Sequence, residues 1–311
     1  MLYKILDKKD FESFVTNLIS LYEVIGPKKI NKSLHDFVTI KAFKDIDLDY
    51  KRTTLPPTKK LLFPPVEPIV SYKIDKNIKV NPVVDSKEQL LFGVSAWDIN
   101  GMNFLDKIFT TDFIDENYIS KRKKLIVIGY DVNPSDANFA DKMDASYAKE
   151  GFDLFISDIG DKYFFRVATI KGAEIIQKFN KFSDPLPKDY KDFDKKMDEY
   201  KNNFKVKTNL DNLYENFEIV YGRDTLWEKL AKNCFSCGSC NLVCPTCFCF
   251  NVRDDMEMNL VDGIKSRQWD SCMICDYGLV AGGHNFRPTE ANRLKQRYRC
   301  KLKTFVEKYG Q

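Results

Sequence analysis

Histidine is scarce in this chain, and cysteine is absent from its first 233 residues. The 311 residues include two histidines, His35 and His284, and nine cysteines. No run of about 18 apolar residues is present, so we expect no membrane-spanning helix. The charged start, Met1 to Asp10, is followed by no apolar segment of the kind found in secretory signals, so we expect a protein of the reducing cytoplasm.

The sequence also lacks the short motifs by which many enzymes bind nucleotides or a catalytic zinc ion. It contains no Walker loop, no G-x-G-x-x-G and no H-E-x-x-H. Binding of flavin or nicotinamide by this chain is therefore unsupported, and such cofactors would belong to a partner. With 49 basic and 45 acidic residues the net charge is +4, which does not favour a nucleic-acid partner.

Two hydrophobic periodicities predict an α+β fold. Short β-branched runs alternate with helical patterns over residues 90–175, which indicates a mixed α/β domain. The proline-rich stretch 55–69 predicts an extended connector, because proline cannot lie inside a helix. We expect strands at 90–94, 124–129, 152–157 and 162–168, and helices at 1–25, 98–109, 172–179, 185–207 and 226–231.

The composition also changes along the chain. Residues 185–207 form a charge-rich segment of alternating sign, typical of a solvated helix that leads into a linker. We therefore predict two domains. Residues 1–215 form an α/β docking domain, and residues 216–311 form a small, mainly helical, ferredoxin-like domain that binds iron–sulfur clusters.

Cysteine spacing is the most specific pattern in the chain. The segment C-F-S-C-G-S-C-N-L-V-C-P contains Cys234, Cys237, Cys240 and Cys244, followed by Pro245. In this bacterial ferredoxin run three thiolates bind one [4Fe–4S] cluster, and the fourth cysteine ligates a second cluster. Without a secretory signal, such spacing indicates ligation rather than disulfides. The run therefore predicts one-electron transfer.

The remaining cysteines are enough to complete one or two [4Fe–4S] clusters. The expected first cluster is held by Cys234, Cys237 and Cys240, with Cys300 preferred to Cys249 as the fourth ligand. The expected second cluster is held by Cys244, Cys272 and Cys275, with Cys247 or Cys249 completing it. Two alternatives stay open: tetrahedral zinc at the CxxC pairs, which would make a structural scaffold, and reactive cysteines that reduce sulfur or disulfides.

Longer motifs resemble a known family. C-F-S-C-G-S-C-N-L-V-C-P-T-C-F-C at 234–249, W-D-S-C at 269–272 and A-G-G-H-N-F-R-P at 281–288 resemble the iron–sulfur subunit of anaerobic sulfite reductase and the beta subunit of cytoplasmic sulfhydrogenases. Further resemblance lies in L-F-P-P-x-E at 62–67, F-G-V-x-x-x-D at 92–98 and D-I-G-D at 158–161. It implies a non-catalytic component of anaerobic metabolism that carries electrons between a flavoprotein subunit using NAD(P)H and a separate catalytic subunit.

The chain departs from this family in two places. Cysteines of a further cluster in the N-terminal domain would fall at about Trp97, Val132, Asn138 and Ala140, and none of these carries sulfur. The second ferredoxin run of the family would begin beyond Gln311. We therefore expect the N-terminal cluster to be absent, and Cys275 and Cys300 to act as substitute ligands for the missing run.

Two polar residues within the motif at 281–288 are candidate cofactor contacts. His284 could ligate iron or donate a hydrogen bond to a cluster sulfur, and the hydrogen bond is the preferred interpretation. Arg287 begins a basic tail that extends to Lys303, and cations near a net-negative cluster raise its reduction potential. The tail also predicts a docking surface for another subunit.

Overall fold

The computed structural model describes residues 1–84 and 86–310, which form two compact units. The first unit comprises 1–63 and 84–208, and the second comprises 64–83 and 209–311. Two separate segments of the chain therefore form the second unit. The predicted α+β class is confirmed, whereas the division at residues 215 and 216 stays a prediction.

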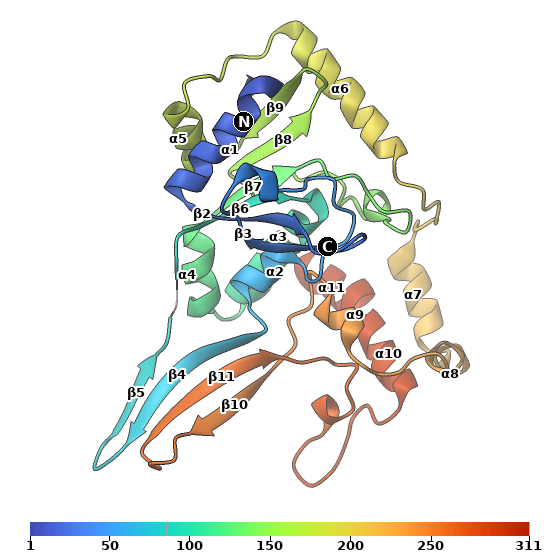
Figure 1. The fold of residues 1–311 in the computed structure, drawn as a ribbon. Coiled ribbons are helices and arrows are strands. Elements are labelled where there is room, and N and C mark those ends of the chain that lie inside the picture. Colours follow the sequence, from blue (N-terminus) through green and yellow to red (C-terminus); the bar gives the residue numbers. More distant parts are fainter. Residues whose placement is uncertain (85, 311) are drawn as a thin grey trace. The chain divides into compact units, whose positions relative to one another are not determined.

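The first unit is built on a seven-stranded mixed sheet with helices on both faces (Figure 1). Strands lie in the order β1-β9-β8-β7-β6-β2-β3, and the four neighbours β8, β7, β6 and β2 run parallel. Its elements are β1 (Leu2–Asp7), α1 (Lys8–Leu21), β2 (Glu23–Lys29), β3 (His35–Thr39), α2 (Pro57–Leu62), β6 (Gln89–Val94), α3 (Ala96–Thr111), α4 (Glu116–Lys124), β7 (Leu125–Tyr130), β8 (Leu154–Asp158), β9 (Lys162–Val167), α5 (Ile170–Lys178) and α6 (Pro187–Asn202).

Helices α1 and α5 bury their apolar sides against one face of this sheet. Phe11, Phe14 and Leu18 recur on one side of α1, and all three are buried in the same cluster as Ile175 and Ile176 of α5. The spacing of three and four residues places them on one helical stripe. This stripe is the periodicity from which an N-terminal helix was predicted. The helix is confirmed for Lys8–Leu21, whereas strand β1 precedes it and strand β2 follows it.

The regular elements predicted after residue 90 are present, whereas the structure before that residue differs from the prediction in several places. The connector predicted at 55–69 is wrong in part, because helix α2 begins at Pro57 and strand β4 begins at Val66. Proline is accepted in the first helical turn, where its missing N–H is not needed. Strand β1 was not predicted; it pairs antiparallel with β9, whose sequence lies more than 150 residues away.

The second unit combines a four-stranded antiparallel sheet with short helices. The strand order is β10-β11-β4-β5, so a hairpin near residue 70 pairs with a hairpin near residue 260. Neither β10 nor β11 was predicted. The elements are β4 (Val66–Ile74), β5 (Ile78–Pro82), α7 (Leu213–Tyr221), α8 (Asp224–Ala231), α9 (Ser239–Leu242), β10 (Phe250–Met256), β11 (Asp262–Trp269), α10 (Glu290–Arg299), a π-helical turn (Cys300–Thr304) and α11 (Phe305–Tyr309).

A buried ion pair links the two hairpins of this sheet. Arg267 on β11 donates to Glu67 on β4 at 2.6 and 2.7 Å, and both side chains are almost fully buried. Nearby, the ring of Tyr72 crosses Gly263, where a Cβ atom would lie 2.2 Å from the ring. The Tyr72 hydroxyl then donates to Asp254 on β10 at 2.5 Å. Interactions across three strands therefore fix the register of the sheet.

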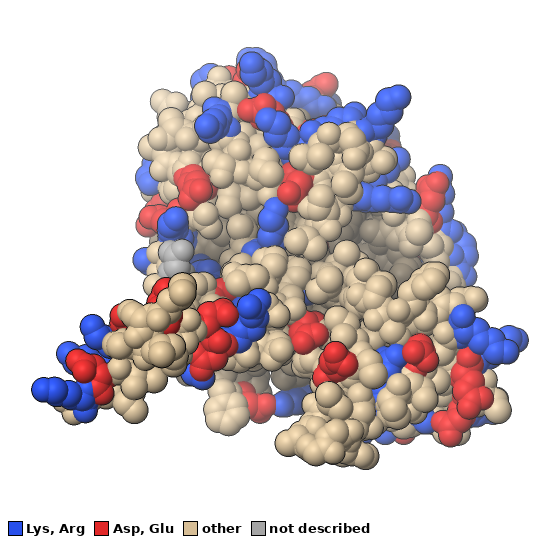
Figure 2. All heavy atoms as spheres, turned by 60° about the horizontal axis from the view of Figure 1, so that its bottom comes forward, with Lys and Arg blue, Asp and Glu red and all other residues tan. Residues whose placement is uncertain are grey.

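Charged side chains of both signs share the molecular surface. On the face shown in Figure 2, Lys and Arg are interspersed with Asp and Glu, and neither sign covers a broad area. Within residues 1–84 and 86–310, no helix is long and apolar enough to cross a membrane.

Asp98 in the first turn of α3 ties the stability of the first unit to pH. Its carboxylate accepts a hydrogen bond from Ser95 at 2.7 Å, and burial raises its pKa to about 6. The unfolded chain has a value near 3.9, so the folded state binds the proton more tightly. This contribution to stability is complete below about pH 4 and is lost as the pH rises through 6.

We predict that Asp98→Asn gains stability relative to the parent chain as the pH rises. The gain in unfolding free energy between pH 5 and pH 8 should be on the order of 1 kcal/mol. Urea unfolding of both proteins across this range measures it, with Asp198→Asn on the exposed side of α6 as the control. Parallel pH profiles for parent and Asp98→Asn would contradict the prediction.

Candidate functional site

The cysteine run packs directly against the segment that carries Cys272 and Cys275. Gly238 lies between Cys237 and Ser239 with φ +77°, a conformation that side chains rarely adopt. A Cβ atom there would lie 2.9 Å from Cβ of Ser271 and 3.3 Å from Cγ1 of Ile274. Glycine therefore allows both the turn and the close approach of the two cysteine-bearing segments.

Asn241 connects three segments of the site. Its amide donates to Oγ of Ser271 at 2.9 Å and to Sγ of Cys272 at 3.1 Å. Its carbonyl oxygen accepts from Nε of Arg297 at 2.8 Å, and the residue is 1% exposed. Sequence reasoning missed Asn241, because a single polar residue within the cysteine run carries no periodicity that marks it as buried.

Three cations spaced by four residues follow the cysteine run. Arg293 donates to Oγ of Ser236, Arg297 to the carbonyl oxygen of Cys240, and Lys301 to Oγ1 of Thr246, at 3.1, 3.2 and 2.7 Å. Residues four apart share one side of a helix. One side of α10 and the turn after it therefore contacts three successive points of the run.

Strand pairing brings Cys249 and Cys272 together. In the β10–β11 hairpin Phe250 pairs with Trp269, so the residues just outside this pair are neighbours. The backbone N–H of Asp270 donates to the carbonyl oxygen of Cys249 at 3.0 Å. A hydrogen bond from the Cys272 thiol lowers the pKa of Cys249 to about 6 and raises that of Cys272.

A second thiol pair and one further thiol lie beside this pair. A hydrogen bond from Cys247 lowers the pKa of Cys244 well below its usual value and raises that of Cys247. Cys300, whose pKa is raised by burial, interacts electrostatically with both Cys244 and Cys249. We call these residues the five-thiol group: Cys244, Cys247, Cys249, Cys272 and Cys300.

Lys301 places a positive charge against the five-thiol group. Burial lowers the pKa of its ammonium, but electrostatic interactions with Cys244, Cys247 and Cys300 outweigh this effect and raise the pKa. Arg297 is influenced in the same way by Cys240, Cys244 and Cys247. Two cations thus offset the charge of deprotonated thiols, which reduces the cost of burying them.

The other predicted site residues lie outside this group. Cys237 is exposed, and a hydrogen bond with Ser239 lowers its pKa. Cys275 lies within 3.5 Å of the Asn285 amide. His284 is exposed and packs its ring edge-on against Phe286 at 4.7 Å. Arg287 is half-buried, and its buried Nε has no hydrogen-bond partner among the described residues. Cys234 accepts from the backbone N–H of Ser236 at 3.4 Å.

The donor set of the second unit fits an iron–sulfur cluster. All nine cysteines are free, and Arg297 and Lys301 lie close to four of them, Cys240, Cys244, Cys247 and Cys300. In the described part of the chain, no three Cys, His, Asp or Glu side chains converge as ligands of a single ion. A [4Fe–4S] cluster takes one thiolate on each iron, so its ligands surround the cluster instead of meeting at one atom. Thiols distributed in pairs around a common region suit such a cluster.

Packed side chains occupy two positions at which the resemblance places a further cluster in the family. The ring of Trp97 meets that of Phe204 edge-on at 6.4 Å. Phe204 also contacts Tyr200, whose hydroxyl donates to the carbonyl oxygen of Val132 at 2.9 Å. Val132 and Phe204 are fully buried. Aromatic packing therefore connects Trp97 with Val132.

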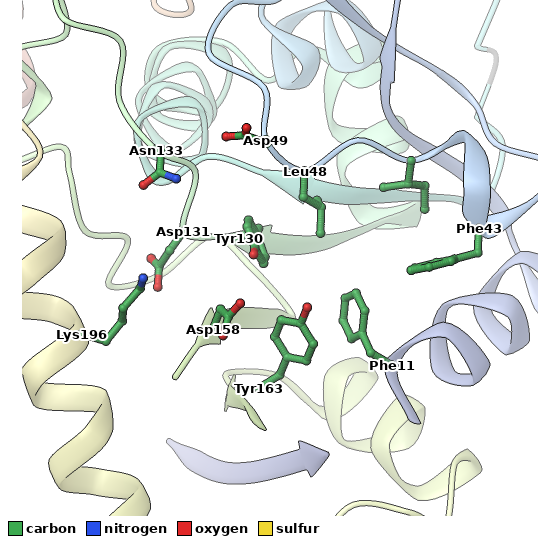
Figure 3. A pocket seen from close by; sticks show the side chains of 11 residues that line it. Phe11, Phe43, Leu48, Asp49, Tyr130, Asp131, Asn133, Asp158, Tyr163 and Lys196 are labelled. Atoms are coloured by element: carbon green, nitrogen blue, oxygen red, sulfur yellow. The ribbon is translucent and has the colours of Figure 1, made fainter. Parts of the chain in front are cut away.

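The first unit also contains a cavity of about 420 Å³ at the ends of β7 and β8 (Figure 3). Open α/β sheets commonly bind ligands at this edge. Asp131 and Lys196 point toward each other there, and burial raises the pKa of Asp131 to about 6. The described lining includes no cysteine, so this cavity is separate from the cysteine site.

Comparisons with known proteins agree with this chemistry. Residues 233–311, which contain all nine cysteines, match the family model of a 4Fe-4S dicluster domain. Sulfhydrogenase 2 subunit beta of Pyrococcus furiosus is 33% identical over 302 residues, which cover 97% of this chain and 88% of that protein. No solved structure gives a significant match. The cofactors are [4Fe–4S] clusters, as the cysteine spacing predicted.

We predict that Asn241→Leu destabilises the second unit. Leucine has a similar volume but leaves Arg297 and the buried Ser271 without this partner, at about 1–3 kcal/mol for each group. Urea unfolding should show a loss of about 2–4 kcal/mol. Asn251→Leu, at an exposed position of β10, is the matched control and should change the unfolding free energy little. Equal effects of the two substitutions would contradict the role of Asn241.

Proposed function

This chain belongs to the family of sulfhydrogenase beta subunits, and from this premise we propose that it relays single electrons within a cytoplasmic oxidoreductase complex. The proposed partners are a flavoprotein subunit that uses NAD(P)H and a separate catalytic subunit. The observation that carries the proposal is the five-thiol group with Lys301 beside it, in a domain that matches the dicluster model.

In this proposal the clusters supply one-electron chemistry, and the chain supplies their environment. Its thiolates provide the ligands. Lys301 and Arg297 stabilise the added negative charge on reduction, and Asn241 donates a hydrogen bond to the sulfur of Cys272. Hydrogen bonds to sulfur and nearby charge are the means by which proteins set cluster potentials.

We further propose that Cys275 is a ligand of the first cluster and Cys300 a ligand of the second, the reverse of the assignment predicted from the sequence. Cys275 follows Ile274, which packs against Gly238 in the first run, so Cys275 suits the cluster of Cys234, Cys237 and Cys240. Cys300 interacts with Cys244, Cys249 and Cys272, which supports a second cluster within the five-thiol group. Four of its five thiols would serve as ligands.

Iron and acid-labile sulfide, measured on protein purified without oxygen, test the proposal directly. Two clusters require about eight of each per chain, and one cluster requires about four. Cys275→Ser and Cys300→Ser should each lose about half of the iron. Because they affect different clusters, the electron paramagnetic resonance spectra of the two reduced variants should differ.

Three results would contradict parts of this proposal. Purified protein that contains zinc and no iron would indicate a structural scaffold instead of an electron-transfer subunit. An unchanged iron content in both serine variants would show that Cys275 and Cys300 are not cluster ligands. Reduction of polysulfide by the isolated, reduced chain would favour a cysteine-based sulfur or disulfide site instead.

We predict that Lys301→Met lowers the midpoint potential of one cluster. Removing a positive charge beside the five-thiol group makes an added electron less favourable. A roughly tenfold smaller equilibrium constant for one-electron reduction corresponds to a potential about 60 mV lower. Lys303→Met is the matched control, because Lys303 instead pairs with Glu218 at 2.7 Å. Redox titration followed by electron paramagnetic resonance measures both variants, and equal potentials would contradict the role of Lys301.

A further inference from the structure

A basic cavity of about 310 Å³ lies on the side of α10 that does not contact the cysteine run. Arg287, Lys295 and Arg299 line it together with Tyr221 and Phe286, and none of its described lining residues is acidic. The single-sign lining differs from the mixed charges over the face shown in Figure 2. This local concentration of positive charge favours an anionic ligand or surface.

Most of this charge is not neutralised by the described residues of the chain. Lys295 pairs with Asp224 at 2.9 Å, and that carboxylate is largely exposed. Among the described residues, Arg287 and Arg299 form no ion pair with a carboxylate, and the buried Nε of Arg287 donates to no acceptor. Two guanidinium groups therefore remain available to bidentate carboxylate partners.

Aromatic rings give the cavity an apolar part. Lys295 and Arg299 lie over the ring of Tyr221, at 4.5 and 5.8 Å from its centroid. The ring of Phe286 is exposed, with 66% of its surface accessible. Exposed aromatic and arginine side chains are enriched in protein interfaces and among the residues that dominate binding energy.

The two sides of α10 have different neighbours. Arg293 and Arg297 contact the cysteine run, whereas Lys295 and Arg299 line the cavity. These alternating positions fall on different sides of a helix with 3.6 residues per turn. A protein bound in the cavity would therefore contact one side of this helix while another side contacts the cysteine run.

From these observations we infer that the cavity is the docking site for an acidic surface segment of a redox partner protein. The inference rests on the proposed electron-transfer function and names the chemistry of one partner. Carboxylates of the partner pair with Arg287, Lys295 and Arg299, while an apolar side chain covers Phe286. Charge complementarity of this kind steers association in the small, transient interfaces typical of redox partners.

Binding of a small acidic redox protein tests the inference. The probe is a fluorescently labelled plant-type [2Fe–2S] ferredoxin, titrated anaerobically with the cluster-loaded chain at about 0.01 M and about 0.15 M salt. Lys295→Glu combined with Arg299→Glu should weaken binding at least about tenfold at low salt and flatten its salt dependence. Lys76→Glu combined with Lys79→Glu changes the net charge equally on the exposed β4–β5 hairpin and should leave binding within about twofold.

A milder variant and a small reductant distinguish a wrong docking site from a failure of the proposed electron transfer. Arg299→Gln removes one exposed charge and should weaken binding measurably without affecting the fold. Equal losses in both double variants, or no loss in either, would overturn the docking site. Displacement of the probe by millimolar phosphate at constant ionic strength would identify a small-anion site instead. Reduction of the clusters by the methyl viologen radical, a cation that needs no basic site, tests electron transfer independently.

Discussion

Anionic sulfur has to be positioned and neutralised in the second unit, and the side chains of α10 and of the turn after it do both. Arg293, Arg297 and Lys301 contact three successive points of the cysteine run through their hydrogen bonds. Buried negative charge without such partners would cost several kcal/mol for each group. The helix changes to a π-helical turn at Cys300. This turn places the Cys300 thiol and the Lys301 ammonium beside the other members of the five-thiol group. Such turns are frequent at functional sites.

The antiparallel sheet of the second unit fixes the other half of the site. Cys249 precedes β10 and Cys272 follows β11, so the register of that hairpin decides whether their thiols meet. The register in turn depends on β4, which pairs with β11 and buries Glu67 against Arg267. A segment near residue 67 therefore supports cysteines about 200 positions later, which explains why the chain contributes to this unit twice.

Local patterns predicted what local forces determine. The buried strands near residues 90 and 125 and the apolar stripe of α1 follow from side-chain periodicity, and cysteine spacing identified the cofactor. Strands β5 and β10 were missed because they are exposed along their whole length. Strand β4 was missed because it pairs with the distant strand β11. The roles of Asn241 and Ser271 could not be predicted, because only tertiary contacts make these residues part of the site.

The distribution of sulfur limits where this chain can pass electrons. Every cysteine lies beyond residue 233, and the first unit packs aromatic side chains between Trp97 and Val132. Within this chain, the thiols that can hold clusters therefore belong to the second unit alone. Helix α10 places Arg297 beside these thiols on one side and presents Lys295 and Arg299 to the basic cavity on another, where Arg299 forms no ion pair among the described residues. Partner docking and cluster potential consequently depend on the same helix, so a partner's carboxylates bound there would add negative charge near the clusters and disfavour their reduction.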